Sequence, residues 1–267
     1  MDLERIKRVG IAAAYKGADV LRCQFGKISQ VDKKGAIDLV TEADIESEKK
    51  ILSTIQRAFS DHTVLAEESG LNKAVSDYKW LIDPLDGTTN FAHQLPIFSI
   101  SIAFAIKDDI HIGIVLNPVN GELFSAIRGQ GAQLNGSPIR VSMTTKVSES
   151  LLVTGFPYNI HEIFDPIIAR YANCLQASQG IRRLGSAALD LCYVACGRFD
   201  GFWEQNLKPW DTAAGSVIAS EAGAQVTDFS NQNFTVDAKE ILTTNGCIHK
   251  EMLSLLQLKE GNEKRIY

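Results

Sequence analysis

Acidic residues at the ends of predicted strands and the starts of predicted helices are the groups in this sequence that could do chemistry. Glu67 ends the apolar run T-V-L-A, while Asp83 and Asp86 end the run W-L-I and precede G-T-T-N. Asp44 and Asp211 stand where helices are predicted to begin. Sites gather at such positions because rigid elements hold the loops there. Each acid also has an ordinary explanation, as a helix cap, a turn residue or a solvated side chain.

Taken together, these acids indicate a site for hard divalent cations. Carboxylates that converge on one cleft repel unless cations neutralise them, and Mg²⁺ prefers oxygen ligands and completes its shell with water and phosphate oxygens. Asp83 and Asp86 can face one ion across a proline-containing turn, with the Leu85 carbonyl as a further oxygen. Gly87 lets the backbone approach a ligand, and Thr88 supplies a hydroxyl that could hold water.

The spacing of residues in the sequence argues against other kinds of metal or catalytic site. D-P-L-D-G does not fit an EF-hand loop, and the five histidines are dispersed without an H-E-x-x-H pair, which argues against zinc. The sequence has neither the glycine-rich motifs that bind the phosphates of nucleotides nor the G-x-S-x-G motif of a nucleophile elbow. Ser186-Ala187 opens an apolar helix whose free amides could bind an anion, and a helix cap by Ser186 explains the same residues equally well.

Composition is that of an ordinary globular protein. The 267 residues are 45% hydrophobic and 22% charged, with a net charge of −5 and basic residues clustered only in pairs, so nucleic acid is not indicated as a ligand. The five scattered cysteines suggest neither a zinc knuckle nor a disulfide framework. The N-terminus does not resemble a signal peptide and no apolar run approaches the span of a bilayer, so we expect a cytoplasmic protein with no membrane partner.

Two patterns of secondary structure follow one another along the chain. Helical spacing of apolar residues predicts helices over 3–24, 43–59, 162–178, 186–196, 211–222 and 248–257. Short apolar runs predict strands over 63–66, 78–83, 151–154, 180–184, 198–203, 224–227 and 240–244, and residues 97–141 read as an antiparallel meander. We therefore predict one compact catalytic unit over 1–267, with an α+β half over about 1–145 and an α/β half over about 146–267.

Four motifs in order resemble the inositol monophosphatase family, part of a wider group of Mg²⁺-dependent, lithium-sensitive phosphatases. W-L-I-D-P-L-D-G-T-T-N-F (80–91) resembles the family signature D-P-[ILV]-D-G-T-x-N-[FY], and P-W-D-T-A-A-G followed by E-A-G resembles the second signature. D-L-V-T-E-A-D-I-E and L-A-E-E-S-G match two upstream acidic motifs, and T-G-F-P-Y is similar to the bacterial branch. The resemblance extends over residues 3–257 and implies a layered α-β-α-β-α sandwich of the inositol monophosphatase and fructose-1,6-bisphosphatase type.

The resemblance also implies roles for individual residues and two to three Mg²⁺ ions per active site. A first ion would meet Glu67, Asp83, the Leu85 carbonyl and Thr88, and a second would meet Asp83, Asp86 and Asp211, with Glu67 positioning a weaker third. Asp44 and Thr88 would orient the attacking water, so the catalytic set is Asp44, Glu67 and Thr88. Substrate would contact Asp86, Gly87, Thr88, Ser186, Ala187, Glu204 and Asp211. Lys33 aligns with a lysine near the mouth of the site.

The resemblance implies hydrolysis of a small polyol phosphate, with myo-inositol 1-phosphate as the first candidate substrate. It also implies a homodimer. Alternatives within the same superfamily are fructose-1,6-bisphosphatase, histidinol-phosphatase and nucleotide 3′(2′)-phosphatase, because the metal motifs are common to all of them. A different class of hypothesis is a regulatory binding protein that retains the fold, with a moonlighting role in RNA binding or transcription.

Overall fold

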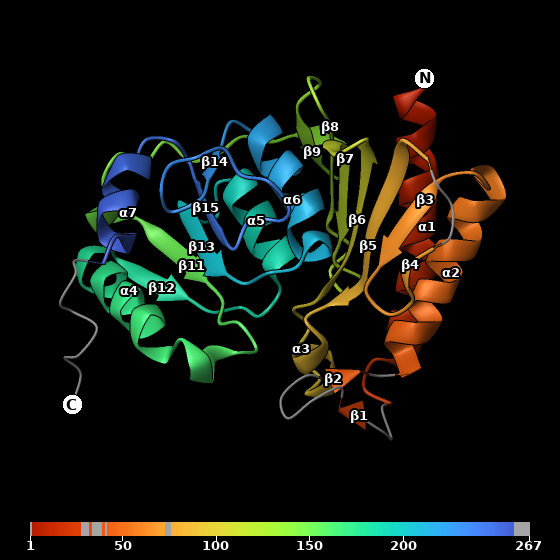
Figure 1. Cartoon of the computed structure of the whole chain (residues 1–267), viewed down its shortest axis with the longest axis horizontal. Coiled ribbons are helices and arrows are strands. Elements are labelled where there is room, and N and C mark those ends of the chain that lie inside the picture. Colours follow the sequence, from red (N-terminus) through yellow and green to blue (C-terminus); the bar gives the residue numbers. More distant parts are fainter. Residues whose placement is uncertain (1, 28–31, 34–38, 41, 73–75, 259–267) are drawn as a thin grey trace.

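The computed structural model describes residues 2–27, 32–33, 39–40, 42–72 and 76–258. Its elements form five layers, in which helices and sheets alternate from one side of the molecule to the other (Figure 1). The side chain of Lys33 lies outside the described residues. In the described part of the chain, no helix is long and apolar enough to cross a membrane.

The first layer is a pair of amphipathic helices, α1 (Leu3–Gln24) and α2 (Glu42–Ala58). They pack on each other and on one face of the larger sheet, where Ile51 and Ile55 meet Trp80 in a single core. The predicted helices over 3–24 and 43–59 are confirmed to within a residue at each end, because their apolar spacing follows the helical repeat through their whole length.

The second layer is an eight-stranded sheet with the order β10-β9-β8-β7-β6-β5-β3-β4. All neighbours pair antiparallel except β3 and β5, so the predicted meander is confirmed. The strands are β3 (Thr63–Ala66), β4 (Gly70–Leu71), β5 (Tyr78–Asp86), β6 (Ser99–Ile106), β7 (Asp109–Leu116), β8 (Leu123–Ile127), β9 (Ala132–Leu134) and β10 (Ser137–Pro138). A separate pair, β1 (Asp32–Lys33) and β2 (Leu39–Val40), was not predicted from the sequence.

The third layer is the helix pair α5 (Ala187–Ala195) and α6 (Pro209–Glu221), which lies between the two sheets (Figure 1). Both helices are buried on nearly every side, as their apolar, alanine-rich sequences require of a central layer. Gly113 on β7 permits the close approach, because a Cβ there would lie 2.3 Å from the Ala214 carbonyl oxygen of α6.

The last two layers are a five-stranded sheet and its outer helices. Strand order is β12-β11-β13-β15-β14, with β11 parallel to both β12 and β13 and the other pairs antiparallel. Neighbouring residues on each strand face opposite cores, so that Val153 packs toward α5 while Leu152 packs toward α7. The remaining elements are β11 (Leu151–Thr154), α4 (Phe164–Ala177), β12 (Gly180–Arg182), β13 (Gly201–Gln205), β14 (Gln225–Thr227), β15 (Glu240–Thr244), α7 (His249–Leu256) and the 3₁₀ turns η1 (Val147–Glu149) and η2 (Ile160–Glu162).

The predicted layered α-β-α-β-α class is confirmed, and the differences lie at element ends. The strand expected over 78–83 continues to Asp86, and α6 begins at Pro209 rather than at Asp211. Proline suits the first turn of a helix because no partner is needed there for its missing N–H. The short helix α3 (Thr88–Ala92) was not predicted.

Candidate active site

The end of β5 carries the densest group of predicted site residues. Asp83 is 2% exposed and pairs with Ser101 of β6, and after a register shift Asp86 pairs with Ser99. Pro84 has no N–H to donate to the ladder, which accounts for the irregularity. Asp83 Oδ1 instead accepts a hydrogen bond from the Leu85 N–H at 2.9 Å. The strand is thus a rigid support that ends in a side-chain-stabilised turn.

Gly87 follows this turn with φ +101°, a left-handed conformation that favours glycine. A Cβ at this position would lie 3.0 Å from the Gly185 carbonyl oxygen and 3.1 Å from that of Ile97. The next residue, Thr88, donates its hydroxyl to the Leu85 carbonyl oxygen at 3.1 Å. The carbonyl and hydroxyl oxygens expected to share a cation are therefore neighbours.

Asp86 joins the two halves of the chain. Its carboxylate accepts hydrogen bonds from the Ser186 hydroxyl at 2.6 Å, the Ala188 N–H at 2.9 Å and the Ala187 N–H at 3.3 Å. The Ser99 hydroxyl donates to the same carboxylate oxygen as Ser186, at 3.4 Å. The anion at the N-terminus of α5 in this structure is therefore a protein carboxylate, where helix amides and the helix dipole favour negative charge.

Asp211 reaches the same region from the first turn of α6. It is the third residue of that helix, and its Oδ2 accepts from the Lys208 N–H at 2.7 Å. It is therefore not the N-cap that its position after Pro209-Trp210 suggested. Asp44 is likewise inside α2 rather than capping it, and it is 1% exposed.

Electrostatics show that four of the predicted acids share one neighbourhood. Burial raises the pKa of Asp83 well above its ordinary value, and the charges of Glu67, Asp86 and Asp211 raise it further. Burial also raises the pKa of Asp211, and the charges of Asp86 and Glu67 add to the effect. For Asp86, burial raises the pKa although its four hydrogen bonds oppose the shift. Such mutual repulsion is what a divalent cation would relieve.

The donor set fits Mg²⁺ in its chemistry, although the side chains are not arranged as a closed cage. Among the described residues, no three His, Cys, Asp or Glu side chains converge as metal ligands. Asp83, Asp86 and Asp211 instead turn toward nearby N–H and hydroxyl donors. The observation that supports the fit is the group of mutually repelling carboxylates, buried at Asp83 and half-buried at its neighbours, together with the Leu85 and Thr88 oxygens that follow Asp83 in the chain.

Glu204 on β13 lies close enough to Asp211 and Asp86 to feel their charges. It is 6% exposed, and burial raises its pKa to about 8, with a further contribution from the charge of Asp211. A Cβ at Gly155 would lie 2.1 Å from Glu204 Oε2, so glycine at that position leaves room for the carboxyl group.

Two further buried polar residues were not predicted from the sequence. Asp190 on α5 is 1% exposed, and within the described part of the chain its Oδ1 has no hydrogen-bond partner. Burial raises its pKa well above the ordinary value, as do the charges of Glu204 and Asp86. Asn90 donates to the carbonyl oxygens of both Ile97 and Leu184 at 2.7 Å. A charged residue inside the otherwise apolar helix sequence A-A-L-D-L-C was the signal available for Asp190.

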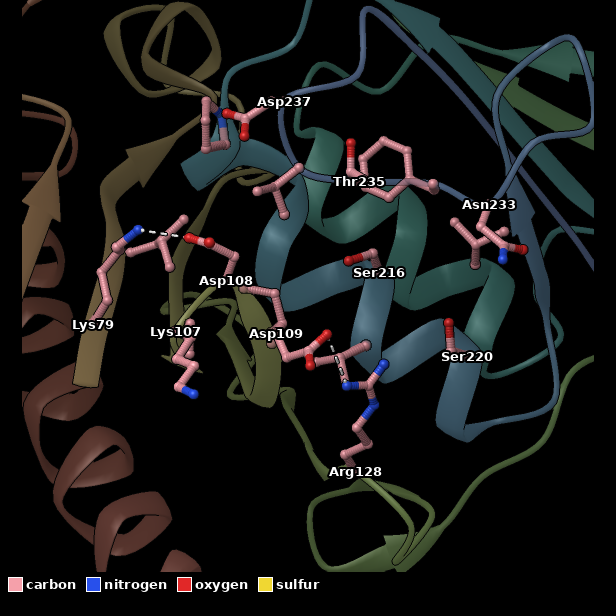
Figure 2. A pocket seen from close by; sticks show the side chains of 18 of the residues that line it. Lys79, Lys107, Asp108, Asp109, Arg128, Ser216, Ser220, Asn233, Thr235 and Asp237 are labelled. Atoms are coloured by element: carbon pink, nitrogen blue, oxygen red, sulfur yellow. Dashed lines mark hydrogen bonds and ion pairs between the residues drawn. The ribbon is translucent and has the colours of Figure 1, made fainter. Parts of the chain in front are cut away.

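A separate pocket of about 760 Å³ is lined by α6, by β5 to β7 of the larger sheet and by residues 233–237, and none of the predicted site residues lines it. Figure 2 shows hydroxyls of Ser216 and Ser220 on one wall. Charged residues on the opposite wall form the ion pairs Lys79–Asp108 and Arg128–Asp109, each at 3.4 Å. Because its charges are largely paired with each other, the pocket does not single out a charged ligand.

Comparisons with known proteins identify the family of this chain. The model of the inositol monophosphatase family matches residues 2–260. An inositol-1-monophosphatase of Synechocystis sp. is 47% identical over 92% of this chain and 86% of its own length, and the Nus factor SuhB of Haemophilus influenzae is 40% identical over 96% and 97%. The solved inositol monophosphatase of Anabaena (Nostoc) sp. has a TM-score of 0.88 at 41% identity, with 96% of each chain covered. The chain belongs to the inositol monophosphatase family and is a phosphatase.

Proposed function

We propose that this phosphatase is a Mg²⁺-dependent phosphomonoesterase that hydrolyses a small polyol phosphate, with myo-inositol 1-phosphate as its preferred substrate. The observation that carries the proposal is the grouping of Asp83 and Asp86 on β5, Asp211 on α6 and Glu67 just after β3, because the charges of Glu67, Asp86 and Asp211 raise the pKa of Asp83. Similarity to a relative that is named for inositol-1-monophosphatase supports this choice of substrate. The two halves act as one catalytic unit in this proposal, because Asp86 from the first is bound by α5 from the second.

The proposed cation ligands are those that the family resemblance implies. Glu67, Asp83, the Leu85 carbonyl and Thr88 would hold one Mg²⁺, and Asp83, Asp86 and Asp211 would hold another, with a third, weaker ion near Glu67. Bound Mg²⁺ would lower the pKa of a water molecule and offset negative charge on the phosphoryl and leaving-group oxygens.

The proposed catalytic groups orient the attacking water. Thr88 donates its proton to the Leu85 carbonyl, which leaves its hydroxyl oxygen free to accept a hydrogen bond from water. Asp44 is buried on α2 and would accept the second proton of the same water. This pair would direct a lone pair of the water at phosphorus, as in-line attack requires.

The proposed substrate contacts lie around the same turn. Gly87 and Thr88 would meet the phosphate from one side, and Ser186 and Ala187 from the other. The Ser186 hydroxyl and the Ala187 amide each have one proton, which they donate to Asp86 in this structure, so a bound phosphate would have to share or replace those hydrogen bonds. Glu204, whose pKa is raised to about 8 by burial and by the charge of Asp211, would meet a substrate hydroxyl with its carboxyl oxygens.

The proposal is tested by replacing Asp211. The Asp211→Asn variant keeps a carbonyl oxygen to accept the Lys208 N–H, so the fold is expected to survive. Phosphate release from myo-inositol 1-phosphate should depend on Mg²⁺ in the wild type and be abolished in Asp211→Asn. Asp108→Asn, which removes a carboxylate that is 98% exposed, is the matched control and should keep wild-type turnover. Unchanged turnover in folded Asp211→Asn would contradict the proposal.

Substrate choice is resolved by comparing kcat/KM for myo-inositol 1-phosphate, fructose 1,6-bisphosphate, histidinol phosphate and adenosine 3′,5′-bisphosphate. We propose that the first is preferred, that lithium inhibits its hydrolysis, and that the enzyme is a cytoplasmic homodimer, all from the family resemblance.

A second candidate function is a regulatory role, because several similar proteins, 40% identical over most of this chain, are named Nus factor SuhB. A role in a transcription complex would not need metal chemistry. The Asp211→Asn variant therefore separates the two functions, since it should still bind such a complex while releasing no phosphate.

A further inference from the structure

Helix α2 turns a buried polar face toward the proposed active site. Asp44, Ser47 and Glu48 lie on one side of the helix at the spacing of a single turn, and each is at most 3% exposed. Charged side chains are seldom so deeply buried unless they are paired, because burial costs them their hydration. The hydrogen bonds of Ser47 and Glu48 show which parts of the chain this face contacts.

Glu48 holds the turn that follows Glu67. Its Oε2 accepts a hydrogen bond from the Glu68 N–H at 2.9 Å, and its Oε1 accepts from the Ser69 N–H at 3.0 Å. On the other side, the N–H of Glu67 itself donates to the Ile82 carbonyl oxygen of β5 at 3.1 Å. The backbone around Glu67 is thus fixed by β5 before the residue and by α2 after it.

Ser47 ties the same helix to the second acidic segment. Its hydroxyl donates to the Pro84 carbonyl oxygen at 3.0 Å, inside the turn that joins Asp83 to Asp86. Gly17 of α1 lets α2 lie deep enough for this contact, because a Cβ at Gly17 would lie 2.7 Å from Ser47 Oγ. One helix therefore sets the position of the Glu67 turn relative to the Asp83 turn.

Water could provide hydrogen bonds to the N–H groups of the Glu67 turn in place of Glu48. Ser69 is exposed and Glu68 is half-buried, so water can reach this part of the chain. Burial of the Glu48 side chain, which is 3% exposed, also costs the carboxylate its hydration. The two hydrogen bonds of Glu48 fix the backbone of the turn that carries Glu67, whose charge raises the pKa of both Asp83 and Asp211.

We infer that Glu48 is a positioning residue for the cation site, which holds the 67–69 turn so that Glu67 faces Asp83 and Asp211. The inference rests on the proposed Mg²⁺-dependent function. It extends that function to a residue that touches neither substrate nor metal and acts only through the backbone of the turn. Outer-shell groups of this kind orient metal ligands, and their loss typically lowers metal affinity about 10- to 100-fold.

The test is the Glu48→Gln variant, which keeps the shape of the side chain but has one acceptor where two N–H donors point. Titration calorimetry with Mg²⁺ alone, without substrate, should show affinity lowered by about 10-fold or more. The Mg²⁺ concentration for half-maximal phosphate release should rise by the same factor, with kcat at saturating Mg²⁺ within about threefold of wild type. Glu46→Gln makes the same charge change on the exposed side of α2 and should leave Mg²⁺ affinity unchanged.

The measured Mg²⁺ affinity of the variants decides whether Glu48 positions the cation site. A folded Glu48→Gln protein with wild-type Mg²⁺ affinity would overturn the inference, because general weakening of the helix would lower stability but not the affinity of the folded site. If Glu48→Gln does not fold, Glu48→Asp keeps both acceptors on a shorter side chain, and wild-type Mg²⁺ affinity in that variant would overturn the inference instead. Failure of the wild-type protein to bind Mg²⁺ would contradict the proposed function itself, which this titration detects separately.

Discussion

Replacing Gly155 with alanine tests whether Glu204 defines the substrate end of the site. A Cβ at Gly155 would lie 2.1 Å from Glu204 Oε2 and 2.4 Å from its Oε1 and Cδ. Because non-bonded heavy atoms are normally separated by about 3.5 Å, the carboxyl group must withdraw by about 1 Å or more. Glu204 is 6% exposed, so it cannot simply swing into solvent.

The size of the effect follows from that displacement. A shift of about 1 Å in a group that positions substrate can cost about 10²-fold in rate, which corresponds to about 2.7 kcal/mol. We therefore expect kcat/KM for myo-inositol 1-phosphate to fall about 10²-fold in Gly155→Ala. Overpacking should also lower the free energy of unfolding by about 1–3 kcal/mol, which leaves a folded protein to assay.

The assay is steady-state phosphate release at saturating Mg²⁺, with Gly180→Ala as the matched control. Gly180 lies on the neighbouring strand β12, and a Cβ there would come no closer than 3.5 Å to another group, so turnover should not change. Adding Glu204→Asp to Gly155→Ala shortens the displaced side chain, and the double variant should be no worse than Glu204→Asp alone. Wild-type kcat/KM in folded Gly155→Ala would refute the assignment of Glu204.

Two further predictions concern stability. Gly113→Ala should lower the free energy of unfolding by about 1–3 kcal/mol in urea titrations, because its Cβ would lie 2.3 Å from the Ala214 carbonyl oxygen and force α6 away from β7. His249 is buried between the hydroxyls of Thr227 and Thr244, and burial lowers its pKa to about 4 from an ordinary 6.5. The unfolded chain therefore binds the extra proton between pH 6.5 and 4, so stability that is complete above pH 6.5 is lost as the pH falls, by up to about 3 kcal/mol. His249→Gln should show a weaker acid dependence of its urea midpoint than wild type, and a wild-type slope would contradict this account.

Apolar patterns predicted the elements that are buried along most of their length. The helix over 3–24 has the expected bounds because its apolar stripe keeps the helical repeat throughout. The strands over 63–66, 151–154 and 240–244 also have the expected bounds, because each is a short, mostly buried run between polar or glycine residues. The short α3 could not be predicted in this way. It has five residues and is held by tertiary contacts, including those of Asn90 with two distant carbonyl groups.

The grouping of acids was predictable, but the partners of each acid were not. Strand ends and motif order placed Asp83, Asp86 and Asp211 in one neighbourhood, and their mutual effect on pKa agrees with this. The bonds of Asp86 to α5 join residues about a hundred positions apart, which no local pattern specifies. The same holds for Glu48, whose role depends on a turn that follows it by twenty residues.

The acids of this site differ in how much of their negative charge is left for a bound cation to neutralise. Asp86 is compensated by two helix amides and two hydroxyls, so part of its charge is already balanced by the protein. Asp83 has one amide donor and is opposed by three other carboxylates. Binding of Mg²⁺ should therefore relieve most repulsion at Asp83 on β5, while Asp86 stays fixed by α5. Since Asp211 comes from α6, a cation shared by these residues would also draw the central helices toward the first sheet, which couples metal binding to the contact between the two halves of the chain.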